Sequence, residues 1–181
     1  MSLDEWANLP EDDPGEVVDG LLVEEEVADF DHECIVAWLM IVLGSWVFAR
    51  DGWVFGSEGK FALRTGLGRK PDMSVFLPGS TVPPRHGPGR VPPDIAVEVI
   101  STTARDVRRD RIEKAKEYAA FGVRFYWLID PDDRTFEIFE LDSSGRYVRL
   151  VGAVAGTIDV PGCEGLQLNL DALWAKIDQL V

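Results

Sequence analysis

The chain carries, at residues 93–101, the stretch Pro93-Asp94-Ile95-Ala96-Val97-Glu98-Val99-Ile100-Ser101. A short apolar run that is rich in branched residues and preceded by prolines is typical of a buried strand. Successive side chains of a strand point to opposite faces, so Glu98 shares a face with Asp94, and the branched residues 95, 97 and 99 share the other. The run therefore predicts a strand with one acid on an inner face.

A helix and a second strand follow this run. Residues 101–121 have a helical pattern that ends at Gly122, a residue suited to the left-handed position after a helix. The apolar face of this helix is predicted to hold Ile112, Ala115, Tyr118 and Ala119. Arg124–Ile129 is nearly all apolar and predicts a strand. Strand, helix and strand in this order predict two parallel strands joined by a right-handed crossover.

The region before residue 93 predicts one helix and three strands. The helix runs from about Asp31 to Phe48, with Trp53–Phe55 and Phe61–Leu63 as the two arms of a hairpin. Asp72–Leu77 is the third strand. Residues 78–93 contain six prolines and three glycines and predict a long exposed loop.

The region after residue 130 predicts a β meander and a short helix. Asp130 opens a turn, Thr135–Leu141 and Tyr147–Val151 form a hairpin, and a strand at Leu166–Leu170 leads into a helix at Leu170–Leu180. We therefore expect a single domain over residues 1–181 of the α/β (α+β) class. Its mixed sheet is flanked by helices, and its core has the order αβββαβ before the meander.

Charge is distributed unevenly over the 181 residues, whose net charge is −14. Residues 1–49 hold thirteen of the 32 acidic residues and no Lys or Arg, which leaves 19 acids against 18 basic residues in the rest of the chain. We interpret residues 1–28 as an acidic lead-in. Six basic residues lie between Arg105 and Lys116. They form either a surface for a phosphate-bearing ligand or a solvated helix face with alternating charges.

Nothing in the sequence predicts a membrane span or a disulfide framework. The longest apolar run, Ile35 to Phe48, is shorter than a spanning helix requires, and the acidic start does not resemble a signal peptide. Cys34 and Cys163 form no paired motif. We expect a cytoplasmic protein without a membrane partner.

Asp72 and Glu98 are acidic residues at predicted strand positions, where an ionised carboxylate is costly unless it is paired or bound to a metal. One interpretation is that Glu98 forms a salt bridge with an arginine of the following helix. The other is that the two carboxylates bind one hard divalent cation, which prefers oxygen ligands. Such a cation can lower the pKa of a bound water and neutralise charge on a phosphate.

Three stretches resemble a known family. They are Lys70-Pro71-Asp72, residues 93–101, and residues 114–131 with Tyr118, Gly122-Val123 and Tyr126-Trp127-Leu128-Ile129-Asp130-Pro131. Together with Glu16-Val17-Val18-Asp19-Gly20 and His32, they resemble the putative restriction-endonuclease family that was first catalogued as a domain of unknown function. That family belongs to the PD-(D/E)XK nuclease superfamily, and the resemblance covers about residues 15–150.

The resemblance implies a catalytic site made of Asp72, Glu98 and a lysine, with Mg²⁺ or Mn²⁺ held by the two acids. The superfamily's usual lysine position, two residues after the acid, is Ile100 here. The family implies a lysine that has migrated to the following helix, and Lys114 matches that place. Lys116 is the neighbouring candidate, but it faces another side of the helix. A lysine at this place can orient the attacking water or stabilise charge on the phosphate.

Other residues are weaker candidates for a role in the site. Asp94 is either a second metal ligand or a loop anchor, and Glu33 is a candidate supporting acid. The remaining residues are interpreted as structural: His32, His86 and Ser101, the core pair Tyr126 and Trp127, and the turn residue Asp130.

The sequence thus favours a Mg²⁺-dependent endonuclease that acts on DNA. The alternative is a non-catalytic nucleic-acid- or protein-binding module that kept the fold. Restriction-type nucleases often present two sites to a duplex, so we also expect a homodimer. The acidic lead-in predicts competition with nucleic acid at the basic helix, which deletion of residues 1–14 would relieve at low salt.

Overall fold

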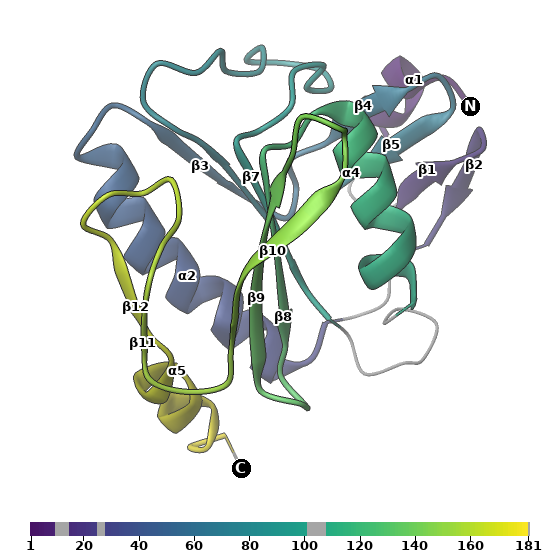
Figure 1. Ribbon diagram of the computed structural model, residues 1–181. Coiled ribbons are helices and arrows are strands. Elements are labelled where there is room, and N and C mark those ends of the chain that lie inside the picture. Colours follow the sequence, from purple (N-terminus) through teal and green to yellow (C-terminus); the bar gives the residue numbers. More distant parts are fainter. Residues whose placement is uncertain (10–14, 25–27, 101–107, 181) are drawn as a thin grey trace.

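The computed structural model of the chain describes residues 1–9, 15–24, 28–100 and 108–180. Its helices are α1 (Leu3–Ala7), α2 (Phe30–Phe48), the π-helix η1 (Arg109–Lys114), α4 (Ala115–Phe121) and α5 (Leu170–Ile177). Its strands form three sheets, and the mixed sheet flanked by helices confirms the predicted fold class (Figure 1).

The largest sheet has six strands in the order β10-β9-β8-β7-β6-β3. Their bounds are β3 (Trp53–Gly56), β6 (Met73–Phe76), β7 (Ile95–Val99), β8 (Phe125–Asp130), β9 (Thr135–Leu141) and β10 (Tyr147–Ala153). β7 and β8 are parallel and all other neighbours in this sheet are antiparallel. This arrangement confirms the predicted strand–helix–strand crossover.

The two faces of the large sheet are covered by different helices (Figure 1). On one face, α2 packs against the odd-numbered residues of β7 and β8, such as Val97 and Trp127, in the largest apolar cluster. On the other face, Tyr118 of α4 packs with Ala96 and Tyr126 in a smaller cluster. The alternation predicted for β7 therefore holds, and Glu98 lies on the α4 side.

The predicted hairpin between the two strands after the first helix is wrong. β3 pairs with β6, whereas β4 (Phe61–Arg64) pairs with β5 (Leu67–Arg69). β4 and β5 join β1 (Glu16–Val18) and β2 (Leu21–Val23) in a separate sheet of order β2-β1-β5-β4. The run of residues 67–69 is too short to give a clear alternating pattern, and strand partners across sheets are chosen by tertiary packing.

The interpretation of residues 1–28 as a lead-in is also wrong for the described part. Trp6 of α1 is fully buried and donates a hydrogen bond from Nε1 to the carbonyl of Gly15 at 2.8 Å. It packs with Leu3 and Val17 in a third apolar cluster, so tightly that a Cβ on Gly68 would lie 2.4 Å from its ring. Deleting residues 1–14 would therefore remove core residues, and that deletion does not isolate the effect of the acids.

The helix predicted over residues 101–121 is described from residue 108 onward, so Ser101 and Arg105 lie outside the described residues. Because η1 is a π-helix, its side chains are rotated relative to an α-helical pattern. The predicted apolar face is consequently wrong at Ile112, which is exposed, while Asp110 and Lys114 are buried. Gly122 ends α4 in the left-handed conformation, as predicted, with φ 98°.

The loop of residues 78–93 is largely exposed, as predicted, and a backbone bridge from Gly89 to Phe61 ties it to β4. The chain ends with β11 (Thr157–Asp159) paired to β12 (Gln167–Asn169), followed by α5 on the α2 side of the sheet. β12 and α5 agree with the predicted strand and helix, whereas no strand was predicted at the position of β11. α2 is long and apolar enough to cross a membrane by length and composition, a test that the core helix of a soluble protein also passes.

Candidate active site

A polar pocket lies at the end of β7, where the two larger sheets, α2 and η1 meet. Its walls come from β1, the start of α2, the turn after β3, the segment between β5 and β6, the end of β7, and η1. The lining residues are Glu16, His32, Ser57, Lys70, Asp72, Glu98, Val99, Arg109, Asp110 and Lys114. All three residues predicted from the sequence to form a site, Asp72, Glu98 and Lys114, therefore line this one pocket.

Glu98 is held by two residues of the following helix. Its carboxylate is 2% exposed, and Oε2 accepts a hydrogen bond from Lys114 Nζ at 2.7 Å while Oε1 accepts one from the Tyr118 hydroxyl at 2.7 Å. Lys114 and Tyr118 are four residues apart and so lie on one side of the helix. The partner of Glu98 is a lysine of this helix, and not the arginine that one interpretation of the sequence expected.

Asp72 is fixed beside Glu98 through the end of β7. It precedes β6, and its Oδ2 accepts a hydrogen bond from the backbone N–H of Val99 at 2.7 Å. The same oxygen lies 3.2 Å from Nε2 of His32, in the first turn of α2. The bond to Val99 places the Asp72 carboxylate one residue beyond Glu98 along β7.

The Lys114 ammonium is surrounded by acids. Besides Glu98, it lies 3.4 Å from Asp110 and 3.9 Å from Glu16. Asp72 contributes to its electrostatic surroundings. One buried cation therefore faces four carboxylates, which come from β1, η1, β7 and the segment before β6.

Glu16 connects the small sheet to this pocket. Its Oε2 accepts a hydrogen bond from Arg69 at 2.7 Å, and its Oε1 accepts one from the backbone N–H of Lys70 at 2.8 Å. Arg69 in turn donates to both oxygens of Glu117 on α4, at 2.7 and 3.1 Å. The sequence argument did not assign Glu16, Asp110 or Tyr118 to the site. The sequence did offer a signal for Glu16, because this acid stands at the start of an apolar strand, just as Glu98 stands within one.

The charges of the pocket shift the pKa values of its members. Burial raises the pKa of Glu98 well above its usual range. Lys114 opposes this shift, and the neighbouring acids Asp72, Asp110 and Glu16 add to it. Burial also raises the pKa of Asp110. Burial lowers the pKa of Lys114, but Glu16, Glu98 and the other acids outweigh it and the net pKa is raised. The acids around Lys114 thus favour its charged form, whereas burial opposes the ionisation of Glu98 and Asp110.

His32 responds to the same field. Burial lowers its pKa, but the hydrogen bond to Asp72 and the charges of Asp72, Glu33 and Asp31 raise it above its usual value. For Glu16, burial raises the pKa, and the charges of Lys114 and Arg69 with the hydrogen bond from Lys70 outweigh it and lower the pKa. His32 therefore binds a proton more readily than a free imidazole does, and Glu16 loses its proton more readily than a free carboxyl does.

The donor set of the pocket fits a hard divalent cation. Asp72 and Glu98 offer carboxylate oxygens, the ligand type that Mg²⁺ and Mn²⁺ prefer. Burial and the neighbouring acids raise the pKa of Glu98, and a bound dication would favour its ionised form. Among the described residues, no group of three or more His, Cys, Asp or Glu side chains is arranged as a metal site. A cation in this pocket would be held by two carboxylates and several waters.

The weaker candidates lie elsewhere or have structural contacts. Asp94 accepts a hydrogen bond from the backbone N–H of Leu77 at 2.7 Å and anchors the loop of residues 78–93. Lys116 is exposed and lines a different groove, with Arg146 and Tyr147. The remaining residues have these positions: Glu33 and His86 are exposed, Tyr126 and Trp127 are buried in the core, and Asp130 accepts a turn hydrogen bond from Asp133 and pairs with Arg111.

The architecture is that of a nuclease fold. The chain superposes on the crystal structure of a putative nuclease belonging to DUF820 from Anabaena variabilis ATCC 29413 with a TM-score of 0.73. The match covers 97% of this chain and 98% of that one at 22% sequence identity, which shows a shared fold.

A comparison with family models identifies the family of the chain. The model of the Uma2 family, described as "Putative restriction endonuclease", matches residues 3–171, and the chain belongs to this family. A comparison with curated proteins gives no match. Family and fold together support a nuclease, and they agree with the resemblance seen in the sequence.

Proposed function

We propose that this protein is a Mg²⁺-dependent endonuclease that hydrolyses phosphodiester bonds of DNA at the pocket of Asp72, Glu98 and Lys114. The observation that carries the proposal is the meeting of a buried ammonium with one carboxylate on β7 and one just before β6, through the 2.7 Å contact from Lys114 to Glu98 and the 2.7 Å bond that ties Asp72 to Val99. Acids and a lysine in one pocket can together hold a cation and stabilise charge on a phosphate.

Each residue has a distinct role in this proposal. Asp72 and Glu98 hold the divalent cation, Mg²⁺ or Mn²⁺, which when bound neutralises phosphate charge and lowers the pKa of a water. Lys114 keeps its proton because the surrounding acids raise its pKa. Its ammonium has three hydrogens, so it can donate to Glu98 and also to the attacking water or a phosphate oxygen.

Two further side chains orient the acids. Tyr118 donates to Glu98 and fixes the plane of that carboxylate, and His32 lies against Asp72. A carboxylate has about four lone-pair sites, so the bonds to both oxygens of Glu98 and to Oδ2 of Asp72 leave lone pairs for a cation. These residues position the acids, whereas Asp72, Glu98 and Lys114 face the reacting atoms.

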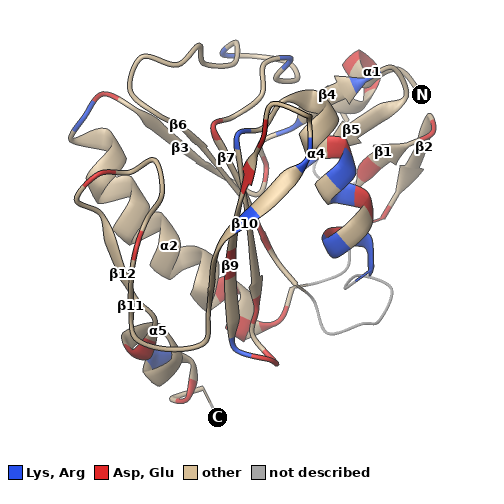
Figure 2. Ribbon diagram, in the orientation of Figure 1, with Lys and Arg blue, Asp and Glu red and all other residues tan. Residues whose placement is uncertain are grey.

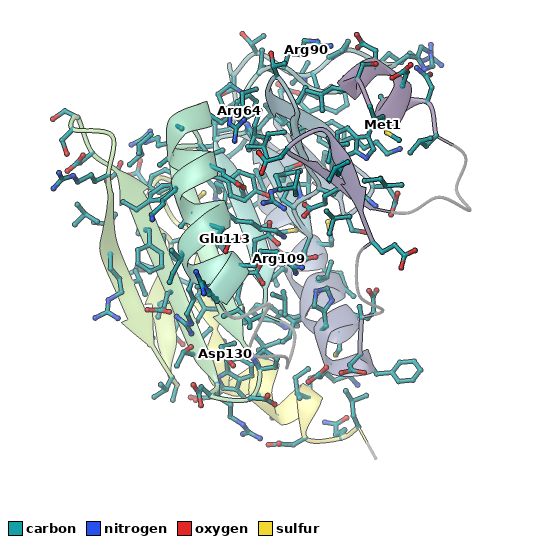
Figure 3. All side chains as sticks on the ribbon, turned by 90° about the vertical axis from the view of Figure 1, so that its right-hand side faces the viewer. Met1, Arg64, Arg90, Arg109, Glu113 and Asp130 are labelled. Carbon is teal, nitrogen blue, oxygen red and sulfur yellow. The ribbon has the colours of Figure 1, made fainter. Side chains whose placement is uncertain are left out.

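The start of η1 supports a phosphate-bearing substrate. Arg109 lines the pocket and Arg108 is exposed beside it. Figure 3 looks onto the side of the molecule where Arg109 and Glu113 lie, and Figure 2 shows basic residues along this helix with acidic residues between them. This local charge attracts a polyanion although the whole chain has a net charge of −14.

The alternative function is a non-catalytic nucleic-acid- or protein-binding module. It is favoured by the contacts of Glu98, because both of its carboxylate oxygens accept hydrogen bonds from the following helix. A purely structural ion pair would have the same form. We further propose a cytoplasmic location, which fits the two free cysteines Cys34 and Cys163, and a homodimer that presents two sites to a duplex.

Cleavage of supercoiled plasmid by the purified protein, with Mg²⁺ or Mn²⁺ against EDTA, tests the proposal. Asp72→Asn, Glu98→Gln and Lys114→Ala should each lower the cleavage rate by about 10²–10³, the usual effect of removing one electrostatic stabiliser. Lys116→Ala is the matched control, because Lys116 is exposed on the same helix. It should cleave at the wild-type rate.

Two results would contradict the nuclease proposal. Equal cleavage by the wild type and all three site variants would assign the activity to a contaminant. Metal-independent binding of DNA by the wild type, with no cleavage in either metal, would favour the binding module.

A further inference from the structure

The outer side of α2 carries an exposed apolar stripe. Its inner side is fully buried against the sheet through Ile35, Leu39 and Leu43. On the outer side, Phe30 is 86% exposed, Ile41 69% and Phe48 58%, and Ala37 is exposed between them. Exposed apolar patches of this kind mark interaction sites in soluble proteins. Figure 2 draws α2 almost entirely without charged residues between its two ends.

The stripe is symmetric about the middle of the helix. Phe30 and Phe48 lie nine residues to either side of residue 39, and Ala37 and Ile41 lie two residues to either side. If two copies of α2 pair antiparallel about this point, each Ile41 meets the small Ala37 of the other copy, and each Phe30 meets Phe48. Such a self-complementary pattern suits an isologous, twofold interface.

The charges at the helix ends fit the same antiparallel pairing. Asp29 precedes α2 and does not cap it with its side chain, and Asp31 and Glu33 lie in the first turn. Arg50 follows the other end and is held there over the ring of Trp46 at 4.3 Å. An antiparallel pair would bring the basic end of each helix, where Arg50 lies, toward the acidic start of the other copy, whereas a parallel pair would place acids against acids.

We infer that a second copy of this chain docks on this stripe, with the two α2 helices antiparallel and crossing near residue 39. The inference names the surface of the homodimer and does not depend on the nuclease activity. The stripe spans the nineteen residues from Phe30 to Phe48, and the eighteen steps between them are about 27 Å of helix. An interface built on one helix is at the small end of specific interfaces, so the dissociation constant should be about 1–100 µM.

Sedimentation or light scattering of the full chain between about 1 and 200 µM tests this dimer. Ile41→Glu places a carboxylate near the centre of the interface in both copies. It should raise the dissociation constant by at least about 100-fold. Val154→Glu is the matched control, since Val154 is 60% exposed and lies outside α2, in the turn between β10 and β11. It should leave the dissociation constant unchanged.

A charge exchange tests the orientation of the helices and does not place a charge in the apolar stripe. Asp29→Lys and Arg50→Glu should each weaken the dimer by about 3- to 10-fold, and the double variant should recover wild-type association because it restores the pair with reversed signs. A double variant weaker than either single variant would overturn the antiparallel arrangement.

Two other outcomes would overturn the inference. A wild type that stays monomeric at 200 µM, or an Ile41→Glu variant that dimerises like the wild type, would show that the stripe is not a dimer interface. If the monomeric wild type instead floats with phosphatidylcholine–phosphatidylglycerol vesicles and Ile41→Glu does not, the stripe binds a lipid surface. Circular dichroism and thermal melting of each variant establish that it is folded.

Discussion

The two faces of the large sheet are built from the same strands and have opposite chemistry. On the α2 face, alternate residues of β7 and β8 bury only apolar side chains, with Val97 and Trp127 fully covered. On the α4 face, the same two strands present Glu98 and Tyr126, and the covering helix adds Lys114 and Tyr118. The α2 face stabilises the fold by burying apolar side chains, whereas the α4 face buries charged side chains.

The difference shows where the fold of this protein accepts a cost in stability. Replacing buried ion pairs by an apolar layer of the same volume is often neutral or stabilising for the fold. The raised pKa of Glu98 is the sign of that cost. We therefore expect substitutions on the two faces to change stability in opposite directions, and the following predictions test this contrast.

The largest expected effect is on the α2 face. Trp127→Ala leaves a cavity in the largest apolar cluster, and large-to-small changes of this kind cost about 3–5 kcal/mol of unfolding free energy. Urea unfolding at pH 7 measures the loss. Trp53→Ala is the control at a half-exposed tryptophan on the edge strand β3, and it should cost about 1 kcal/mol or less. Equal losses would mean that this cluster is not the main source of stability.

The second effect belongs to the α4 face and to the proposed cation. Mg²⁺ at about one hundred times its dissociation constant should raise the unfolding free energy by about 2.7 kcal/mol, because it binds the folded state. Thermal melting with and without Mg²⁺ measures this shift. Asp72→Asn should abolish it, and Glu113→Gln, at an exposed acid outside the pocket, should preserve it. An undiminished shift in Asp72→Asn would place the cation elsewhere.

The smallest effect has the opposite sign to the first. The pKa of Glu98 is raised above its usual 4.5, so its contribution to stability is fully present below that pH and is lost as the pH rises through the folded pKa. Glu98→Gln removes this loss and should raise the unfolding free energy by about 1 kcal/mol at pH 7, with no gain below about pH 4. Denaturant unfolding across this pH range checks both limits.

Glu24→Gln serves as the control for that pH series, because Glu24 is exposed after β2. Its stability should follow the wild type at every pH. If Glu98→Gln is instead less stable than the wild type at pH 7, then the pairing of Glu98 with Lys114 outweighs the cost of burying its charge. In that case the α4 face, like the α2 face, stabilises the fold.

The sequence by itself determined the local features of this protein. The two-residue period of residues 95–100 assigned Glu98 to the face opposite Val97, because alternation is a property of any strand. The parallel crossover from β7 to β8, the exposed loop and the end of α4 at Gly122 followed from equally local rules. The placement of Lys114 beside Glu98 agreed with the family resemblance, although the catalytic roles stay predictions.

Only the tertiary structure decided which distant segments meet. β3 and β4 look like one hairpin in sequence, yet they pair in two different sheets, because a strand's partner depends on packing. Glu16 reaches Lys114 only because β1 pairs with β5 and brings the start of the chain to the pocket. The π-helical turn likewise moved Asp110 inward and Ile112 outward. Local pattern fixes which face a residue occupies, but the contacts of that face come from parts of the chain far away in sequence.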